Sequence, residues 1–146
     1  MFIIHGHDHR NMSRLKELVR DRFGLEPVVL VDELARGRTV IEKFEAEAAN
    51  CAFAFALLTP DDQVRTGAGE HTQARPNVVF ELGWFYAKLG RNRVVLLVKK
   101  GMTIHSDLAG IERYEFVDDV REKAIQIEDE LVDAGLLASR LRGSRF

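Results

Sequence analysis

The chain has 146 residues, of which 46% are hydrophobic and 30% charged, and its formal net charge at pH 7 is −2. This length is typical of one domain and this composition of a soluble globular protein, which excludes a largely disordered or fibrous chain. The near-neutral charge gives no electrostatic basis for nucleic-acid binding, because proteins that contact a phosphate backbone carry a basic field or stripe.

The cysteine content and the longest apolar run indicate the compartment. Cys51 is the single cysteine and has no partner for an internal disulfide. The longest apolar run, Cys51 to Leu58, has eight residues, whereas a membrane-spanning helix needs about 20. The segment from Met1 to His5 lacks the basic start of a signal peptide. We therefore expect a cytoplasmic protein without a membrane segment.

Short runs that are apolar throughout predict strands buried on both faces of a sheet. They are Phe2–Ile4, Val28–Val31, Ala52–Leu58 and Val94–Val98, and a fifth strand is expected near Tyr114–Val117. Helical segments separate these runs. Because parallel neighbours need a crossover connection, the alternation predicts a parallel sheet with helices on both faces, of the flavodoxin-like α/β class.

Apolar residues at helical spacing predict the buried stripes of the intervening helices. The stripes are Leu15, Leu18, Val19 and Phe23, then Val40, Ile41 and Phe44, then Phe80, Trp84 and Phe85. A last helix is expected from about Asp119 to Ala134, closed by Gly135. We expect an exposed loop from Pro60 to Pro76. Residues 1–138 are read as one domain, and residues 139–146 as a basic tail that is either disordered or the start of a linker.

One helix carries an isolated carboxylate. From Val78 to Ala87, Glu81 is the only ionisable group apart from the Tyr86 phenol, and Asn77 is a suitable N-cap for this helix. A helix that is apolar on all sides is usually buried, where a carboxylate is costly unless it is paired or faces a cleft. The helix dipole offsets only about 0.3–1 kcal/mol of that cost. Two interpretations remain open: Glu81 pairs inside the core, or it faces a pocket.

Ligands of open parallel sheets bind outside the carboxyl ends of the strands. The polar segment Asp32–Thr39 follows the second strand, and its arginines before a helix suit a phosphate group, although the same residues suit ordinary capping by Thr39. His5, His7 and His9 follow the first strand, but a catalytic zinc needs about three correctly placed ligands and we predict no metal. A phosphoryl-accepting receiver domain would have an aspartate at the end of the third strand, where this chain has Leu58-Thr59-Pro60. We therefore do not expect a receiver domain.

Five blocks of sequence occur in the order found in a known family. The chain resembles the bacterial TIR-like predicted nucleotide-binding family, which supplies the TIR effector domains of bacterial STING and of cyclic-pyrimidine (Pycsar) antiphage systems. The resemblance covers nearly the whole chain. The blocks are Phe2–Asp8, Gly37–Phe44, Leu57–Asp62, Arg75–Gly83 and Ser106–Gly110.

The resemblance implies a TIR fold that hydrolyses NAD to nicotinamide and an ADP-ribose product, linear or cyclic, with NAD as substrate and no cofactor. It places the catalytic glutamate on Glu81. It also implies activation by self-association through TIR–TIR contacts, and a sensor domain or a cyclic-nucleotide-sensing partner outside this chain. The substrate contacts that it implies are Gly6, His7, Asp8, Arg36, Gly37, Arg38, Thr39, Asp61, Arg75 and Asn77, with Trp84, which is equally suited to the core.

A single carboxylate is sufficient for this reaction. Ordinary glycosidases use two, one of them an acid for the leaving oxygen. Nicotinamide leaves NAD as a neutral molecule, so that Glu81 needs only to stabilise the positive charge that develops on the ribose. Two alternatives stay open at this point. One is a catalytically silent module for nucleotide binding or self-association, and the other is a small-nucleotide hydrolase that uses the histidines.

Overall fold

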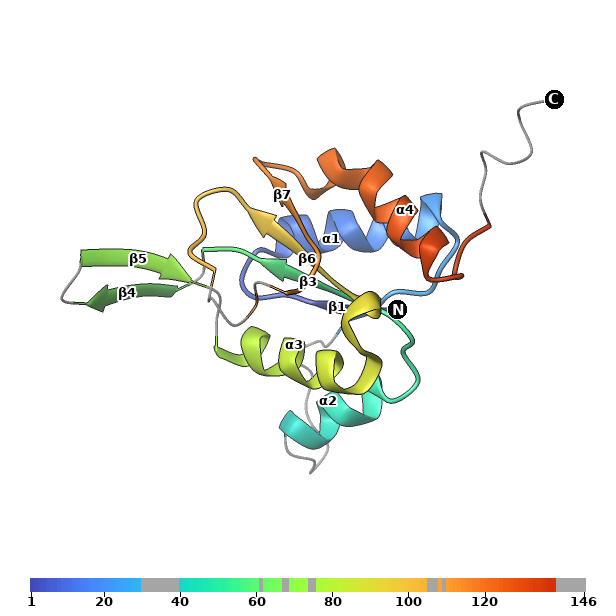
Figure 1. The fold of residues 1–146 in the computed structure, drawn as a ribbon, viewed down its shortest axis with the longest axis horizontal. Coiled ribbons are helices and arrows are strands. Elements are labelled where there is room, and N and C mark those ends of the chain that lie inside the picture. Colours follow the sequence, from blue (N-terminus) through green and yellow to red (C-terminus); the bar gives the residue numbers. More distant parts are fainter. Residues whose placement is uncertain are drawn as a thin grey trace.

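Five parallel strands form the central sheet of the computed structural model (Figure 1). They are β1 (Phe2–Ile4), β2 (Val28–Val29), β3 (Ala54–Leu58), β6 (Val94–Lys99) and β7 (Arg113–Phe116), and they lie in the order β2-β1-β3-β6-β7. The structure describes residues 1–29, 40–60, 62–66, 69–73, 76–104, 108 and 110–138. All five predicted strands are confirmed within these ranges: the first has the predicted ends, and the ends of the third, fourth and fifth differ by one or two residues. The predicted end of the second strand, residues 30–31, lies outside the described residues.

The strand order is that of a flavodoxin-like sheet, which confirms the predicted fold class. β1 pairs with β2 on one side and with β3 on the other. The chain therefore reverses its direction of growth across the sheet between these strands. In sheets of this kind, a ligand binds in the crevice at the carboxyl ends of the strands that flank such a reversal.

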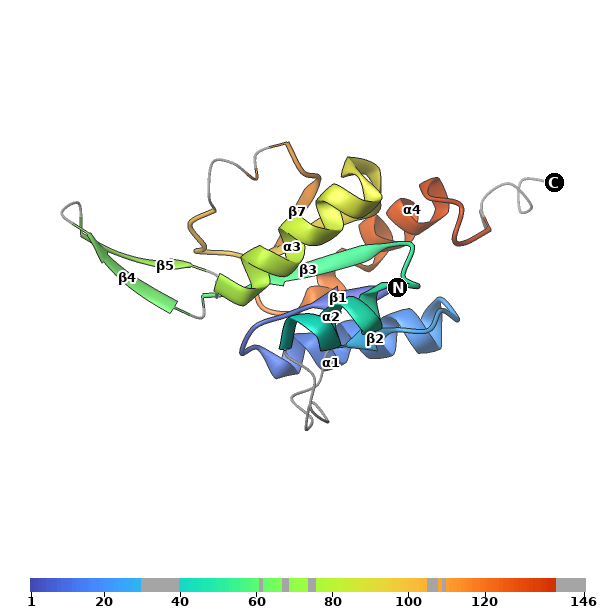
Figure 2. The ribbon, with the colours of Figure 1, turned by 90° about the horizontal axis from the view of Figure 1, so that it is seen from below.

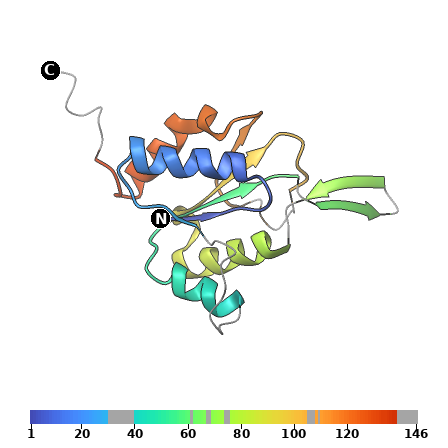
Figure 3. The same ribbon diagram turned by 180° about the vertical axis from the view of Figure 1, so that it is seen from behind.

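Helices cover both faces of the sheet. α1 (His9–Glu17), continued by a π-helical segment η1 (Leu18–Arg22), and α4 (Ala124–Asp133), preceded by a 3₁₀ turn η4 (Val120–Lys123), lie on one face. α2 (Val40–Ala48) and α3 (Pro76–Leu89) lie on the other, and Figure 3 shows the two layers from behind. A 3₁₀ turn, η2 (Arg91–Arg93), connects α3 to β6.

The two faces of β1 contribute to two separate cores, because successive strand side chains point in opposite directions. Phe2 and Ile4 pack with Phe44 of α2 and with α3, while Ile3 packs with Leu15 of α1 and with α4. The side chains of all five named residues are at most 1% exposed. This burial of β1 on both faces agrees with the prediction from its uninterrupted apolar sequence.

The predicted buried stripes of α2 and α3 are partly wrong. Ile41 is 53% exposed and Phe80 is 51% exposed. The buried apolar residues of α3 are Val78, Leu82 and Phe85, so that Phe85 is confirmed as a core residue and Trp84 is half-buried. A helix with apolar residues on nearly every side does not reveal in its sequence which side meets the sheet, so that packing alone decides.

The stretch predicted as an exposed loop contains a hairpin. β4 (Asp62–Thr66) and β5 (Gly69–Gln73) pair in antiparallel fashion, with Thr66 opposite Gly69 at the turn. The hairpin extends away from the central sheet (Figure 2). Its sequence signal is Gly67-Ala68 between the strands, because a two-residue connection that begins with glycine favours a tight hairpin turn.

The last helical segment agrees with the prediction at both ends. Asp119 and Glu122 form a reciprocal capping box: the Asp119 carboxylate accepts a hydrogen bond from Arg121 N at 2.9 Å, and Glu122 Oε1 accepts one from Asp119 N at 2.9 Å. Gly135 follows α4 with φ of 78°, the left-handed conformation of a helix C-terminus. Within the described ranges, no helix is both long and apolar enough to cross a membrane.

Candidate active site

The side chain of Glu81 lies at the packing surface of α3. The helix starts at the carboxyl edge of the sheet (Figure 1). Glu81 is the sixth residue of the helix, so its position in the second turn keeps it near that edge. Glu81 is only 7% exposed, and its neighbours Val78, Leu82 and Phe85 are fully buried. The isolated carboxylate predicted from the sequence is therefore inside the protein.

The helix begins two residues earlier than predicted, because an N-cap at Asn77 would make Val78 the first helical residue. Pro76 is the first residue of α3, and Asn77 is the second rather than the N-cap. Proline is favoured at the first helical position because its missing N–H would have no partner there and its φ already suits a helix. The substrate contact of Asn77 stays a prediction.

Burial without a partner changes the acidity of Glu81. In the part of the chain that the structure describes, no group donates a hydrogen bond to this carboxylate and no cation pairs with it. Burial raises the pKa of Glu81 from 4.5 to about 7. The interpretation in which Glu81 is neutralised by a core arginine thus has no support among the described residues. An acid of this kind near a ligand-binding edge is a candidate functional group.

Aromatic side chains surround the middle of α3. The Trp84 ring lies 5.1 Å from the Phe44 ring and 5.0 Å from the Phe85 ring, measured between centroids. Lys88 Nζ lies 4.7 Å above the Trp84 ring. Trp84 is half-buried in this cluster, so its packing role is established and its substrate contact stays a prediction.

The turn after β1 has a fixed geometry. Gly6 is buried and His7 is exposed. Asp8 is the N-cap of α1: its Oδ1 accepts from Asn11 N at 3.0 Å and its Oδ2 from Asn11 Nδ2 at 2.8 Å. Burial acts to raise the pKa of Asp8, but the hydrogen bonds from Asn11 and the charge of Lys99 outweigh it and hold that pKa below its ordinary value. Asp8 therefore shapes the turn as an anion.

Asn11 is a residue that the sequence analysis missed. Its side chain is 1% exposed; Nδ2 also donates to Asp118 O at 3.2 Å, and Oδ1 accepts from Val120 N at 2.9 Å. Asn11 thereby ties the turn after β1 to the segment after β7. An asparagine three residues after an N-cap aspartate was the available signal, but its partner lies more than a hundred residues away.

Two further residues mark the carboxyl edge. Thr59, only 2% exposed, directly follows β3, and Lys99 is the last residue of β6. The sequence signal for each residue was its position as the first polar residue after an apolar run. Five of the predicted site residues belong to two segments that meet the carboxyl edge of the sheet. The turn after β1 contributes Gly6, His7 and Asp8, and α3 contributes Glu81 and Trp84. The predicted contacts that lie outside the described residues are Arg36, Gly37, Arg38, Thr39, Asp61 and Arg75.

The histidines after β1 are engaged with their surroundings. His5 Nδ1 lies 2.8 Å from Gly6 O, and the rings of His5 and His9 are 5.5 Å apart at an angle of 67°. Over the described ranges, no three histidine, cysteine or acidic side chains come close enough together to hold a metal ion.

The order of the strands, the two helical layers and the family-like block on α3 define a flavodoxin-like domain of the TIR class. Over residues 1–118 the sequence matches the TIR domain of the CAP12/Pycsar effector protein. The chain belongs to this family, which confirms the resemblance found in the sequence.

Three relatives show how far the similarity extends. The chain is 41% identical to the uncharacterized protein YuaY of Escherichia coli K12 over 138 residues, which cover 93% of this chain and 46% of YuaY. It is 30% identical to protein tirC of Dictyostelium discoideum over 84% of this chain and 66% of tirC. It is 41% identical to the Pycsar effector protein PaPycTIR of Pseudomonas aeruginosa over 49% of this chain and 24% of that protein. The chain thus spans about half the length of YuaY and less of PaPycTIR.

Proposed function

We propose that this domain is an NAD glycohydrolase that cleaves NAD to nicotinamide and an ADP-ribose product as an effector of antiphage defence. The observation that carries the proposal is Glu81, a buried carboxylate without a partner among the described residues, at the ligand-binding edge of a TIR domain. The family of the chain, whose description names an effector protein, supports the biological setting.

The chemistry needs one carboxylate because the leaving group needs no acid. The bond between ribose C1′ and the nicotinamide nitrogen breaks, its electron pair stays on nitrogen, and the cationic ring becomes neutral nicotinamide. Water then bonds to C1′ and releases a proton. Positive charge develops on the ribose as the bond breaks, and the fixed negative charge of Glu81 stabilises it. A site of low polarity strengthens that attraction relative to water.

The other predicted contacts would hold the dinucleotide. Gly6 and His7 lie in the turn after β1, where a nucleotide would approach the backbone closely. Asp8 contributes by fixing this turn, since Asn11 occupies both of its carboxylate oxygens. The contacts expected from the segments after β2 and β3 remain predictions; they are Arg36, Gly37, Arg38, Thr39, Asp61, Arg75 and Asn77.

The experiment compares the wild-type protein with Glu81→Gln at high protein concentration and follows nicotinamide release from NAD. We expect the variant to lose at least about a hundredfold in turnover, the scale seen when one fixed electrostatic stabiliser is removed. The matched control is Glu45→Gln, which removes an exposed carboxylate from the neighbouring helix α2. Equal rates in wild type and Glu81→Gln would refute the catalytic assignment.

The same carboxylate predicts a pH dependence. The reaction uses ionised Glu81, and burial places its pKa at about 7. We therefore expect kcat/KM for NAD to rise with pH through about 7 and to level off above it. The measurement is nicotinamide release from pH 5.5 to 8.5. A rate that falls across this range would indicate that Glu81 acts as a proton donor instead.

A catalytically silent self-association module is the alternative. It is favoured by exposed apolar side chains on the two helices of one face: Ile41 on α2 and Val79 and Phe80 on α3, which are 53%, 43% and 51% exposed. The rings of Phe44 on α2 and Phe80 on α3 are 6.4 Å apart, so that the two helices that carry these exposed residues pack together. A protein that assembles but releases no nicotinamide would support this alternative.

A further inference from the structure

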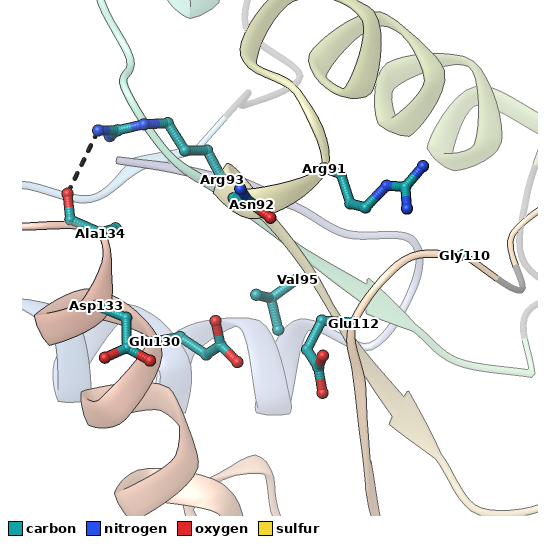
Figure 4. A pocket seen from close by; sticks show the side chains of 9 residues that line it. All are labelled: Arg91, Asn92, Arg93, Val95, Gly110, Glu112, Glu130, Asp133 and Ala134. Carbon is teal, nitrogen blue, oxygen red and sulfur yellow. Dashed lines mark hydrogen bonds between the residues drawn. The ribbon is translucent and has the colours of Figure 1, made fainter.

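The proposed substrate carries two negatively charged phosphates, and a cavity of about 600 Å³ in the domain does not suit them. This cavity lies at the amino edge of the sheet, between η2, the residues before β7 and the last turn of α4 (Figure 4). Its charged lining residues are Glu112, Glu130 and Asp133 against Arg91 and Arg93, and Arg93 already donates to two backbone oxygens, at 3.2 and 3.3 Å. Because the carboxylates repel phosphates, a cation for the phosphates is expected at the carboxyl edge instead.

Lys99 is a cation at the carboxyl edge. It is the last residue of β6, and its side chain is half-buried. Leu58 of β3 lies opposite Val98 of β6, so that Lys99 lies beside Thr59, the residue that follows β3. The ammonium group is therefore next to the crevice at the ends of β1 and β3, where the strand order predicts a ligand.

The register shows on which face of the sheet the Lys99 side chain lies. Val95 and Leu97, at alternate positions of β6, pack in the core with α1 and α4. Phe116, the partner of Lys99 on β7, packs in the same core. Because side chains alternate along a strand, Lys99 points to the α1 side. Its positive charge acts there on the carboxylate of Asp8, the N-cap of α1.

The ammonium of Lys99 has no anionic partner among the residues that the structure describes. No carboxylate there pairs with it, and no oxygen there accepts a hydrogen bond from it. Asp8 is engaged elsewhere, because its two oxygens accept from Asn11 at 3.0 and 2.8 Å. A partly buried ammonium attracts an anion more strongly than one in water, since the local dielectric constant is lower.

The arginines of α1 differ from Lys99 in this respect. Arg10 Nη2 lies 3.4 Å from Asp118 Oδ2, and Arg14 Nη1 lies 3.0 Å from Asp119 Oδ2. Both arginines are thus paired with the segment after β7. Lys99 remains available to an anionic ligand beside the turn after β1.

We propose that Lys99 binds the pyrophosphate of the dinucleotide and thereby makes the domain select nucleotides over nucleosides. The inference rests on the proposed NAD reaction. In NAD the pyrophosphate joins the 5′ oxygens of the two riboses, so that one ribose separates it from the bond that breaks. When the nicotinamide ribose lies at Glu81, on the α3 side, the phosphates extend across the carboxyl edge toward Lys99. A lysine suits them as a point charge.

The pyrophosphate keeps its charge throughout the reaction. An ammonium bound to it therefore stabilises the bound substrate and the transition state equally, which lowers KM and leaves kcat unchanged. This effect differs from that of Glu81, whose negative charge acts on the ribose as the bond breaks. The two residues are thus distinguishable by kinetics.

The first measurement is the binding of ADP-ribose by titration calorimetry, because this molecule keeps the pyrophosphate and needs no turnover. We expect Lys99→Gln to weaken binding at least about tenfold, the scale of one charge-assisted hydrogen bond. The matched control is Lys100→Gln, which removes the same charge from the next, exposed side chain. It should weaken binding at most about threefold, as expected for a surface charge. Thermal unfolding verifies that both variants are folded.

The second measurement compares NAD with nicotinamide riboside, which has the same bond to nicotinamide but no phosphate. Lys99→Gln should raise KM for NAD at least about tenfold with little change in kcat. The same variant should leave kcat/KM for nicotinamide riboside unchanged. Lys100→Gln should behave as the wild type with both substrates.

Three outcomes would overturn the proposal. They are no binding of ADP-ribose to the wild type, equal binding to the wild type and Lys99→Gln, and an equal loss of kcat/KM for both substrates. The last would mean that the lysine acts on the fold or on the ribose. A wild type that binds ADP-ribose through Lys99 but releases no nicotinamide would refute the glycohydrolase reaction alone, so that the two failures are distinguishable.

Discussion

The burial of Glu81 makes the stability of the folded domain depend on pH. Because its pKa is raised from 4.5 to about 7, the folded state binds the proton more tightly than the unfolded state. The favourable contribution is complete below about pH 4.5 and is lost as pH rises through about 7, an effect of up to about 3 kcal/mol. The proposed catalytic carboxylate thus lowers the stability of the folded domain at neutral and alkaline pH.

The substitution Glu81→Gln removes the ionisable group and with it the loss of stability at high pH. We expect the variant to be more stable than the wild type by about 1–3 kcal/mol at pH 8, with the difference vanishing near pH 4.5. Urea unfolding at the two pH values measures it. Glu45→Gln on exposed α2 should change the free energy of unfolding by less than about 0.5 kcal/mol. A gain for Glu81→Gln that is the same at both pH values would contradict the burial of an unpaired acid.

Asn11 gives a second prediction at this scale. Replacing it by alanine leaves the N–H of Val120 buried without its acceptor and frees Asp8 from a side-chain donor. We expect a loss of about 2–3 kcal/mol in the free energy of unfolding, measured by denaturant titration. Ser13→Ala, an exposed position on the same helix, is the control. A loss no larger than that of Ser13→Ala would show that this bridge does not contribute to stability.

Glu81 and Asn11 differ in how well their roles can be predicted from the sequence. Glu81 stood out because it is one charge in an apolar helix, which is a local property of the sequence. Asn11 acts through Asp118 and Val120, whose positions beside α1 depend on the packing of the whole sheet. Local patterns therefore indicate an unusual side chain, whereas a bridge between distant segments becomes apparent only after folding.

The secondary-structure elements show the same distinction. Strands buried on both faces were predictable, because only apolar residues fit there. The buried face of α3 was not, because Phe80 and Phe85 are equally apolar and packing against the sheet buries only Phe85. The β4–β5 hairpin carried a turn signal in Gly67-Ala68, but polar strands without an apolar face give no periodicity by which to recognise them.

Two glycines predict opposite effects of the same substitution. Gly135 ends α4 at φ of 78°, so Gly135→Ala forces a side chain into a left-handed conformation and should cost about 1 kcal/mol. Gly83 lies inside α3, has no positive φ, and a Cβ there would meet nothing within 4 Å. Gly83→Ala should therefore stabilise the domain by about 0.5–1 kcal/mol. Thermal unfolding of both variants measures the two changes in stability. A change in the same direction for both variants would contradict the different backbone conformations of the two glycines.

At the scale of the whole molecule, the proposed enzyme should depend on its own concentration. If assembly through TIR–TIR contacts activates it, nicotinamide release per mole of protein rises with protein concentration, in parallel with the assembled fraction seen by sedimentation. Phe80→Ser, at an exposed apolar position of α3, should weaken both together. Constant turnover per mole over a hundredfold range of concentration would show that the single domain is already active.

Both ends of the described chain lie at the same edge of the sheet. Met1 precedes β1 there, and Arg93, just before β6, donates to Ala134 O at the end of α4. This edge is about 16 Å, the length of one five-residue strand, from the carboxyl edge, near which α3 places Glu81. A fluorophore attached at Met1 would therefore report on the folding of the domain without lying beside the proposed catalytic carboxylate.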